Sequence, residues 1–436
     1  MTWSLDLKDK ETALTIAEAN SRAVGSLVSI SGWIEDIRPL GSLLFAVVRD
    51  VNSSIQLVFD RSSKDAFEIA LNTPRQSYVL ANGLLQESKS KNYPKEVRVF
   101  EMSVLNEAKH PLPLDPTGRV DANLDVRLDA RALDLRNPKV SAIFKIKSSF
   151  LSAARAYLRD RGFIEVNTPK IIGAAAEGGA ELFKVKYFDR EAYLAQSPQL
   201  YKEELTLSLQ RVFEVASYFR AEKSHTTRHL NEFLSLDAEA ALFGKEDAMK
   251  LLEELVATSL KVIKEERDEE FKLLDISLSI PSTPFERITY TDALQYITGA
   301  GREVRFGEDL DSESLKLLSS KFHGYYFITD WPAETKPFYI KPSDGRLTES
   351  FDLMAGALEL ASGGERVASR KLLEERLISK NLNPKDFESH LRCYDWGMPP
   401  HAGWGFGVDR FIANICNLGN IREAVLYPRD ETRLTP

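Results

Sequence analysis

Short runs in which hydrophobic and polar residues alternate fill the first quarter of the chain. Five such runs lie between Val24 and Glu107, and turn-forming residues separate them. A period of two residues predicts strands that bury one face, and the amphipathic stretch 63–71 predicts one short helix before the fourth strand. The pattern therefore predicts a small all-β domain, either a closed barrel or a sandwich.

The pattern changes after this domain. The proline- and aspartate-rich segment 108–138 lacks long periodicity and predicts a linker. Hydrophobic residues at helical spacing then predict a helix over 143–158, and a long amphipathic helix is expected over 245–266. The run FIEVNTPKI (163–171) predicts one strand, in which Pro169 favours an edge or an interface because proline cannot donate to a ladder.

These observations divide the chain into three parts. For residues 1–107 the leading candidate is the OB-fold barrel, since five strands and a helix suit it. Residues 108–138 are predicted to be a hinge or linker. Residues 139–436 mix helices and strands without regular interleaving, which favours an α+β domain with an antiparallel sheet over a doubly wound one.

Composition narrows the class of protein. The chain has 436 residues, of which 43% are hydrophobic and 28% charged, so we expect a soluble globular protein. It contains no apolar run of membrane-spanning length and no secretory signal at its start, and its two cysteines predict neither a metal site nor a disulfide framework. A reducing cytoplasm is the expected location. The net charge of -8 is mild evidence against a nucleic-acid partner.

Four segments of the last part place polar residues in apolar or glycine-rich surroundings. They are AEGGAELF, YLAQSPQLYKE, FRAEKSHTTRHLNEF, and the stretch from SFDLMAGALELASGGER to PPHAGWGFGVDRF. Each has an ordinary interpretation when taken alone: a turn, a solvated lysine, a surface hairpin, or a structural loop histidine at His401. Their occurrence together is what indicates a site.

Together these segments resemble the signature motifs of class II aminoacyl-tRNA synthetases, and closely those of aspartyl-tRNA synthetases of the archaeal type. The helix and strand ending at Pro169 resemble motif 1, FRAEKSHTTRHLNEF resembles motif 2, and GWGFGVDRF resembles motif 3. The resemblance covers nearly the whole chain. It implies a homodimer that uses ATP and L-aspartate to charge tRNA(Asp).

The resemblance implies a set of ATP contacts. Arg220 would clamp the α-phosphate, Glu222 would contact the adenine amino group, and Phe233 would stack on the adenine ring. Arginine suits phosphate because its planar fork makes paired, charge-assisted hydrogen bonds. The remaining implied ATP residues are Arg228 and His229 at the motif 2 loop, Glu359, Gly407, and Arg410 at the γ-phosphate. The implied Mg²⁺ ligands are Asp352, Glu359 and Ser362, oxygen donors of the kind that a hard cation needs.

The same resemblance implies how aspartate is selected. Lys202 and Arg366 match positions that pair with the substrate's side-chain carboxylate, and bound asparagine would leave these cations unpaired at a cost of roughly 3–5 kcal/mol. Further residues implied to hold the amino acid are Glu177, Gln199, Asp237 and Ser362. Ala176 departs from the family pattern, since Ser or Thr commonly stands there.

In the barrel, the resemblance implies anticodon contacts at Phe45, Gln56 and Glu107, because an aromatic platform with polar neighbours suits splayed single-stranded RNA. Trp33 after Gly32 tends to occur in members that also charge tRNA(Asn), so both tRNAs stay open as partners. Two rival functions remain: an asparagine–tRNA ligase or asparagine-forming paralogue, and a catalytically silent tRNA-binding protein. The second is disfavoured because Arg220, Glu359 and Arg410 are all present.

Overall fold

The computed structural model describes residues 13–173, 182–223, 227–343 and 346–436. The chain divides after residue 138 into two compact units. The segment 108–138, predicted to be a linker, contains two short helices, α4 (Leu124–Asp129) and α5 (Arg131–Asp134), and belongs to the first unit. Its role as a hinge stays a prediction.

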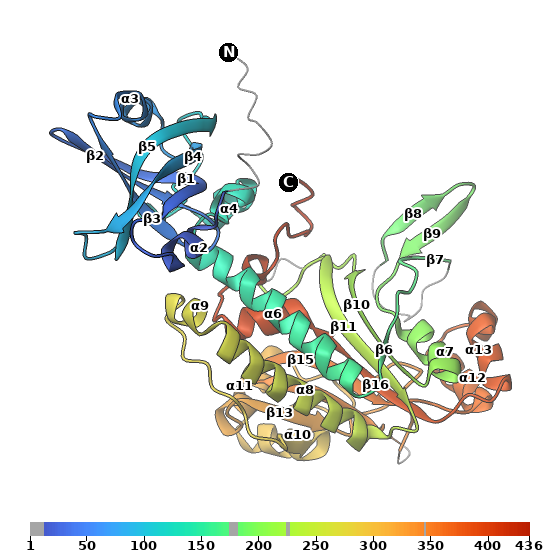
Figure 1. Ribbon diagram of the computed structural model, residues 1–436. Helices are drawn as coiled ribbons and strands as arrows, with labels where there is room; N and C mark the ends of the chain where they lie inside the picture. The colour runs from blue at the N-terminus through green and yellow to red at the C-terminus, as the bar shows by residue number, and fades with distance from the viewer. Residues whose placement is uncertain (1–12, 174–181, 224–226, 344–345) are drawn as a thin grey trace. The chain divides into compact units, whose positions relative to one another are not determined.

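The first unit contains a closed five-stranded barrel, with strands in the order β1-β2-β3-β5-β4 (Figure 1). The strands are β1 (Leu27–Leu40), β2 (Leu43–Arg49), β3 (Ser54–Asp60), β4 (Tyr78–Glu87) and β5 (Lys95–Asn106). Alternate residues point inward: on β2, Leu44, Ala46 and Val48 are buried, while their neighbours are partly exposed. Two helices accompany the barrel, α2 (Ile16–Ser21) and α3 (Lys64–Asn72). All five predicted strands and the predicted helix are present.

The second unit is built on an eight-stranded sheet with the order β12-β13-β14-β15-β16-β11-β10-β6. Its inner strands pair antiparallel, and only the two outermost pairs are parallel. The strands are β6 (Ile164–Glu165), β10 (Arg211–Phe219), β11 (Glu232–Ala241), β12 (Glu286–Thr289), β13 (Tyr325–Thr329), β14 (Ser350–Ala355), β15 (Leu358–Glu365) and β16 (His401–Gly407).

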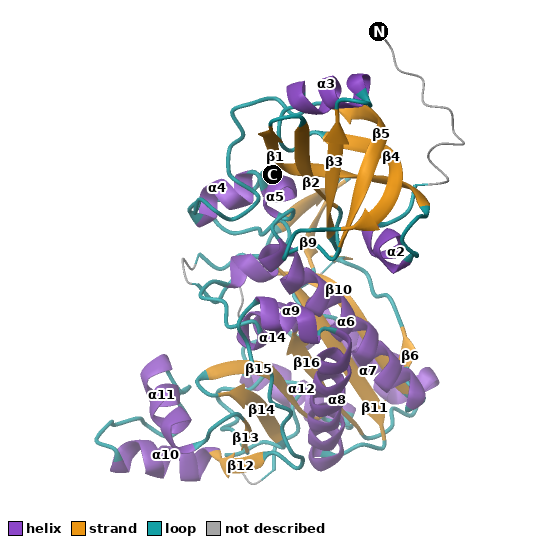
Figure 2. Cartoon of the chain, turned by 60° about the vertical axis from the view of Figure 1, so that its left-hand side comes forward, coloured by secondary structure: helices purple, strands orange, loops and turns teal. Residues whose placement is uncertain are grey.

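Long helices cover one face of this sheet. Both ribbon views show α6 (Pro138–Asp160) and α8 (Lys245–Glu266) lying across it (Figures 1 and 2), and α14 (Val408–Ile415) packs beside them. Apolar residues of these helices, such as Phe150 and Leu252, form one core with the strand residues Trp404 and Phe406. Because side chains alternate along a strand, the opposite face is left for polar residues.

Smaller elements surround the sheet. The helices are α7 (Gln199–Leu209), α9 (Asp268–Leu273), α10 (Tyr290–Gly299), α11 (Ser312–Lys321), α12 (Arg370–Ser379) and α13 (Glu388–Asp395), with 3-10 turns η1 (Pro384–Phe387) and η2 (Ile421–Ala424). A separate three-stranded sheet contains β7 (Ile171–Ile172), β8 (Lys184–Tyr187) and β9 (Arg190–Leu194). Among the described helices, none is long and apolar enough to cross a membrane.

The single strand predicted over 163–171 is wrong. The segment forms two residues of β6, which pair with β10, and then enters the other sheet as β7. Between them the amide N–H and the hydroxyl of Thr168 both donate to the carboxylate of Glu214, at 2.8 and 2.7 Å. Pro169 follows without an N–H, so the chain cannot continue the ladder here.

Candidate active site

The uncovered face of the large sheet carries a cavity. Strand β11 reads LSLDAEAA, in which Leu236, Ala238 and Ala240 enter the core and the polar residues between them turn to the other face. The cavity gathers most of the predicted site residues: Gln199, Arg220, Glu222, Arg228, His229, Phe233, Asp237, Glu359, Ser362, Arg366, Gly407 and Arg410 line it. They come from segments up to 211 residues apart, from residue 199 to residue 410.

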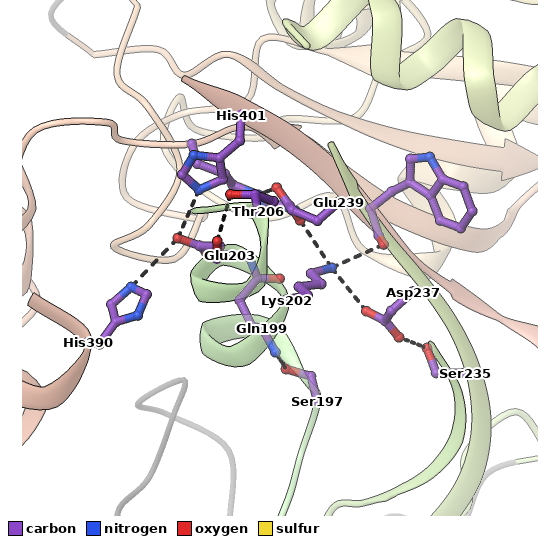
Figure 3. Close-up of polar contacts among 12 residues, drawn as sticks. Ser197, Gln199, Lys202, Glu203, Thr206, Ser235, Asp237, Glu239, His390 and His401 are labelled. Atoms are coloured by element: carbon purple, nitrogen blue, oxygen red, sulfur yellow. Dashed lines mark hydrogen bonds and ion pairs between the residues drawn. The ribbon is translucent and has the colours of Figure 1, made fainter. Parts of the chain in front are cut away.

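Two predicted cations meet at one end of the cavity. The Nζ atom of Lys202, on α7, lies 3.1 Å from Oδ1 of Asp237 and 3.1 Å from the carbonyl oxygen of Trp404 (Figure 3). Arg366 donates from Nε and from one terminal nitrogen to both oxygens of Glu239, at 2.9 and 3.0 Å. Glu239 also lies 3.6 Å from Nζ of Lys202, so the two cations share one carboxylate.

Sequence reasoning missed Glu239, although its side chain is fully buried at the centre of this group. The signal was the alternation in LSLDAEAA, which puts Glu239 on the same face as Asp237. The glycines of motif 3 lie directly opposite: Gly403 pairs with Glu239 and Gly405 with Asp237. A Cβ atom at Gly405 would stand 2.9 Å from Oδ1 of Asp237, so these glycines make room for the buried acids.

The other end of the cavity contains the motif 2 residues. The Nδ2 atom of Asn231 donates to the backbone carbonyls of Arg220 and Glu222, at 2.7 and 3.1 Å, and so ties the two sides of the hairpin together. The guanidinium carbon of Arg220 lies 5.3 Å from the ring centre of Phe233. The Nε atom of Arg220 is buried and has no hydrogen-bond partner among the described residues. A buried, unsatisfied cationic donor is the local chemistry of an anion site.

His229 and Arg410 add positive charge near this end. Burial, and then the positive charge of Arg410, lowers the pKa of His229. Arg410 is the arginine of motif 3 and lies on α14, and one of its terminal nitrogens lies 3.8 Å from Oε1 of Glu359. Loss of water inside the cavity, followed by repulsion from Asp352, raises the pKa of Glu359.

The predicted metal ligands lie on two neighbouring strands. Asp352 on β14 pairs with Ser362 on β15, and Glu359 lies earlier on β15, near its start. Both oxygens of Asp352 accept from Nζ of Lys336 at 2.7 Å, and that nitrogen lies 3.4 Å from Oγ of Ser362. Lys336, which lines the cavity, was not singled out by the sequence. Within the described ranges, no three His, Cys, Asp or Glu side chains form a ready-made metal cluster.

Two predicted residues of this unit do not line the cavity, and the position of a third is not described. Lys202 and Asp352 are buried in its walls and act on it through the contacts above. Glu177 lies outside the described residues.

The predicted anticodon residues all belong to the first unit. Phe45 and Gln56 are partly exposed on neighbouring strands, on the outer side of the barrel. Gln56 donates to Glu96 at 2.7 Å. The ring of Trp33 lies edge-on to Tyr78, with the guanidinium of Arg136 4.6 Å above it. Glu107 is exposed just beyond β5.

Comparison with known proteins identifies the class. A family model described as tRNA synthetases class II (D, K and N) matches residues 123–431, and a model for the OB-fold nucleic acid binding domain matches residues 28–105. The chain therefore belongs to the class II tRNA synthetases and is an aminoacyl-tRNA synthetase. Both fold predictions, the OB-fold barrel and the class II α+β domain, are confirmed.

Individual relatives are similar over almost their full length. The Aspartate--tRNA(Asp/Asn) ligase of Methanothermobacter thermautotrophicus is 46% identical and is matched over 94% of this chain and 95% of its own. The enzyme of the same name from Methanopyrus kandleri is 44% identical, and the match covers 99% of this chain and 100% of that enzyme. The structure of asparaginyl-tRNA synthetase from Pyrococcus horikoshii complexed with asparaginyl-adenylate has a TM-score of 0.92 and 34% identity, covering 97% of this chain and 99% of that one.

Proposed function

We propose that this synthetase is an aspartate–tRNA ligase, which activates L-aspartate with ATP and transfers it to the 3' end of tRNA(Asp) and of tRNA(Asn). One observation carries the choice of amino acid: Lys202 and Arg366 converge on a single buried carboxylate, that of Glu239. Because Lys202 and Arg366 are both positively charged, we propose that they also bind the side-chain carboxylate of aspartate. The names of the similar archaeal enzymes, which include both tRNAs, support the choice of tRNA.

The proposed reaction needs no protein nucleophile. The aspartate α-carboxylate attacks the α-phosphorus of ATP, and pyrophosphate leaves; the terminal 3'-OH of the tRNA then attacks the activated carbonyl, and AMP leaves. Catalysis rests on orientation and on stabilising the charge that develops at the α-phosphoryl oxygens. We assign the α-phosphate to Arg220, whose buried Nε atom lacks a partner among the described residues, and the γ-phosphate to Arg410.

The other predicted roles are proposed on the same basis. Phe233 stacks on adenine beside Glu222, with Arg228 and His229 nearby, and Gly407 lets the backbone approach the nucleotide. Gln199, Asp237 and Ser362 hold the amino acid, as does Glu177. The barrel residues Trp33, Phe45, Gln56 and Glu107 contact the anticodon. A homodimer and a cytoplasmic location remain part of the proposal; exposed Ile164 and Ile171, near Pro169, offer apolar surface for a dimer.

We also propose that Asp352, Glu359 and Ser362 would hold Mg²⁺ when ATP is bound. The chemistry of the donors fits, because Asp352 and Glu359 are near enough for one to raise the pKa of the other, and Mg²⁺ typically uses one or two carboxylates together with substrate phosphates. When bound, the ion would neutralise phosphate charge. Lys336, which pairs with Asp352, supplies positive charge at the same place.

The rival with a specific observation in its favour is an asparagine–tRNA ligase, because solved asparaginyl-tRNA synthetases are similar in structure. Pyrophosphate exchange with the purified enzyme separates the two: we expect exchange driven by aspartate and none by asparagine. Charging of purified tRNA(Asp) and tRNA(Asn) with labelled aspartate then tests the second part. Exchange driven by asparagine alone would reject the proposal, and failure to charge tRNA(Asn) would limit it to tRNA(Asp).

A further inference from the structure

A second buried polar group lies behind the amino-acid end of the cavity, around Glu203 of α7. Glu203 is completely buried, and its Oε1 atom accepts from Nε2 of Gln199 at 2.6 Å. Its Oε2 atom accepts from the hydroxyl of Tyr394 at 3.1 Å. The same oxygen lies 3.4 Å from Nε2 of His401 (Figure 3). His390 approaches from α13, with Nε2 3.7 Å from the same oxygen, an ion-pair distance.

Each histidine ring has oxygen atoms near both of its nitrogens. Nδ1 of His401 lies 2.8 Å from the carbonyl oxygen of Pro399, which can only accept, so Nδ1 must carry a proton. Nδ1 of His390 lies 3.0 Å from Oε1 of Glu204. A neutral imidazole has one N–H only, so double protonation satisfies both sides of the His401 ring. Nε2 of His390 has no hydrogen-bond partner among the described residues and meets Glu203 only at ion-pair distance, a contact that a protonated ring makes favourable.

The electrostatics agree with this geometry. Burial alone would lower the pKa of His390, but the nearby carboxylates of Glu203 and Glu204 override it and raise the pKa to about 9. The pKa of His401 is also raised, because Glu203 outweighs the effect of burial. Burial would raise the pKa of Glu203, yet the two histidines hold it well below its usual range.

The charges that surround the amino-acid end balance only if both rings are protonated. The charged and titratable groups that face the two histidines are Glu203, Glu204, Glu239, Tyr394 and Arg366. Lys202 and Arg366 already match Asp237 and Glu239 in charge. Neutral histidines would leave Glu203 and Glu204 as two uncompensated negative charges beside a site that must admit a carboxylate.

We propose that Glu203, His390 and His401 are positioning residues for the amino-acid site. The two imidazolium rings hold Glu203 as a carboxylate, which can only accept hydrogen bonds. Glu203 therefore binds the amide nitrogen of Gln199, so that the amide oxygen of Gln199 faces the cavity and accepts from the ammonium group of the substrate. This inference rests on the proposed function, because it assumes that an amino acid occupies this end of the cavity.

The first test is Glu203→Gln in the full chain. A glutamine here can offer its own NH₂ group to Gln199, so the orientation of that side chain is no longer fixed. We expect KM for aspartate in pyrophosphate exchange to rise roughly tenfold or more, about the effect of losing one hydrogen bond to a charged group. KM for ATP and kcat should change much less. Glu253→Gln is the matched control, since Glu253 is also buried but accepts from the amide of Phe285, away from the cavity.

The pH profile separates this role from a purely structural one. A raised histidine pKa means that the charged form is present below that pKa and is lost as pH rises through it. KM for aspartate in the unmodified enzyme should therefore stay constant through neutral pH and rise near pH 9, where His390 loses its proton. In Glu203→Gln both histidines lose one of their carboxylates, while His390 keeps Glu204 and His401 keeps Glu239, so their pKa values should fall and KM should begin to rise at a lower pH than in the unmodified enzyme.

A measurement that needs no activity tests the charge state directly. The chain contains 6 histidines, so nitrogen chemical shifts of ¹⁵N-histidine-labelled full-length enzyme can be assigned with His390→Gln and His401→Gln. Two doubly protonated rings at neutral pH support the proposal. Neutral rings there, or an unchanged KM for aspartate in Glu203→Gln at every pH, would overturn it. An enzyme that does not activate aspartate at all would instead refute the proposed function, and the histidine spectra would show which of the two had failed.

Discussion

At the scale of single residues, the amino-acid end of the cavity depends on charges that are buried and paired. Resemblance pointed to Lys202, Asp237 and Arg366, and the structure brings all three together. It could not reveal Glu239, because one acidic residue in an alternating strand looks like part of a solvated face. Whether that face meets water or other side chains is decided by tertiary packing, which local alternation does not encode.

The prediction at this scale concerns Lys202→Ala. Removing the ammonium group takes one cationic partner away from Asp237 and from Glu239. It also removes one of the two cations that we propose to bind the substrate carboxylate. The loss of one partner of a buried ion pair costs roughly 3–5 kcal/mol, so aspartate-dependent pyrophosphate exchange should fall at least about a hundredfold. Circular dichroism should still show a folded chain, and Lys250→Ala, an exposed lysine on α8, should behave like the unmodified enzyme. Unchanged exchange in Lys202→Ala would refute its assigned role.

At the scale of elements, periodicity predicted the barrel strands and the long helices, and it failed where special chemistry intervenes. The helix over 245–266 and the five barrel strands form as expected, since burial of one face sets their period. The predicted strand over 163–171 breaks because the amide of Thr168 donates to the side chain of Glu214 on β10 rather than to a backbone carbonyl of that strand. The short helices α4 and α5 escaped prediction because six and four residues are too few to show a period.

The prediction at this scale concerns the close pairing of β11 with β16. A Cβ atom at Gly403 would lie 2.1 Å from the carbonyl oxygen of Ala238 and 2.3 Å from Oε2 of Glu239. Gly403→Ala must therefore push the two strands apart, and we expect the free energy of unfolding to fall by about 2–3 kcal/mol, as for other overpacked cores. Displacement of Glu239 should also raise KM for aspartate.

Urea unfolding followed by fluorescence measures the first effect. Gly419→Ala is the matched control, because nothing lies within 4 Å of a Cβ atom at Gly419. Equal stability of the two alanine variants would show that β11 and β16 tolerate the extra methyl group.

At the scale of the whole molecule, the two compact units are proposed to recognise different ligands. We assign the tRNA anticodon to the first unit, and ATP and the amino acid to the second. The net charge of -8 argued mildly against a nucleic-acid partner, and membership of the class II tRNA synthetases corrects that expectation. Net charge describes the chain as a whole, whereas a nucleic acid meets only one local surface. Composition could therefore not predict this partner, but the motifs could.

The division predicts a variant that affects one kind of recognition alone. Phe45→Ala removes the proposed stacking platform for an anticodon base, and stacking is worth about 1–3 kcal/mol per base. KM for tRNA in aminoacylation should rise roughly 5- to 100-fold. Pyrophosphate exchange, which needs no tRNA, should be unchanged. Phe100→Ala, an exposed aromatic residue on β5, serves as the control, and a matching loss in both variants would remove Phe45 from the anticodon site.

The carboxylate shared by Lys202 and Arg366 has a consequence for how the enzyme rests between turnovers. In the structure both cations are paired with the carboxylate of Glu239, which occupies the role proposed for the substrate's side-chain carboxylate. An arriving amino acid must compete for partners that are already satisfied. Under the proposed function, an uncharged amide would be a poor competitor in that exchange, so the paired resting state would help to reject asparagine before any chemistry begins.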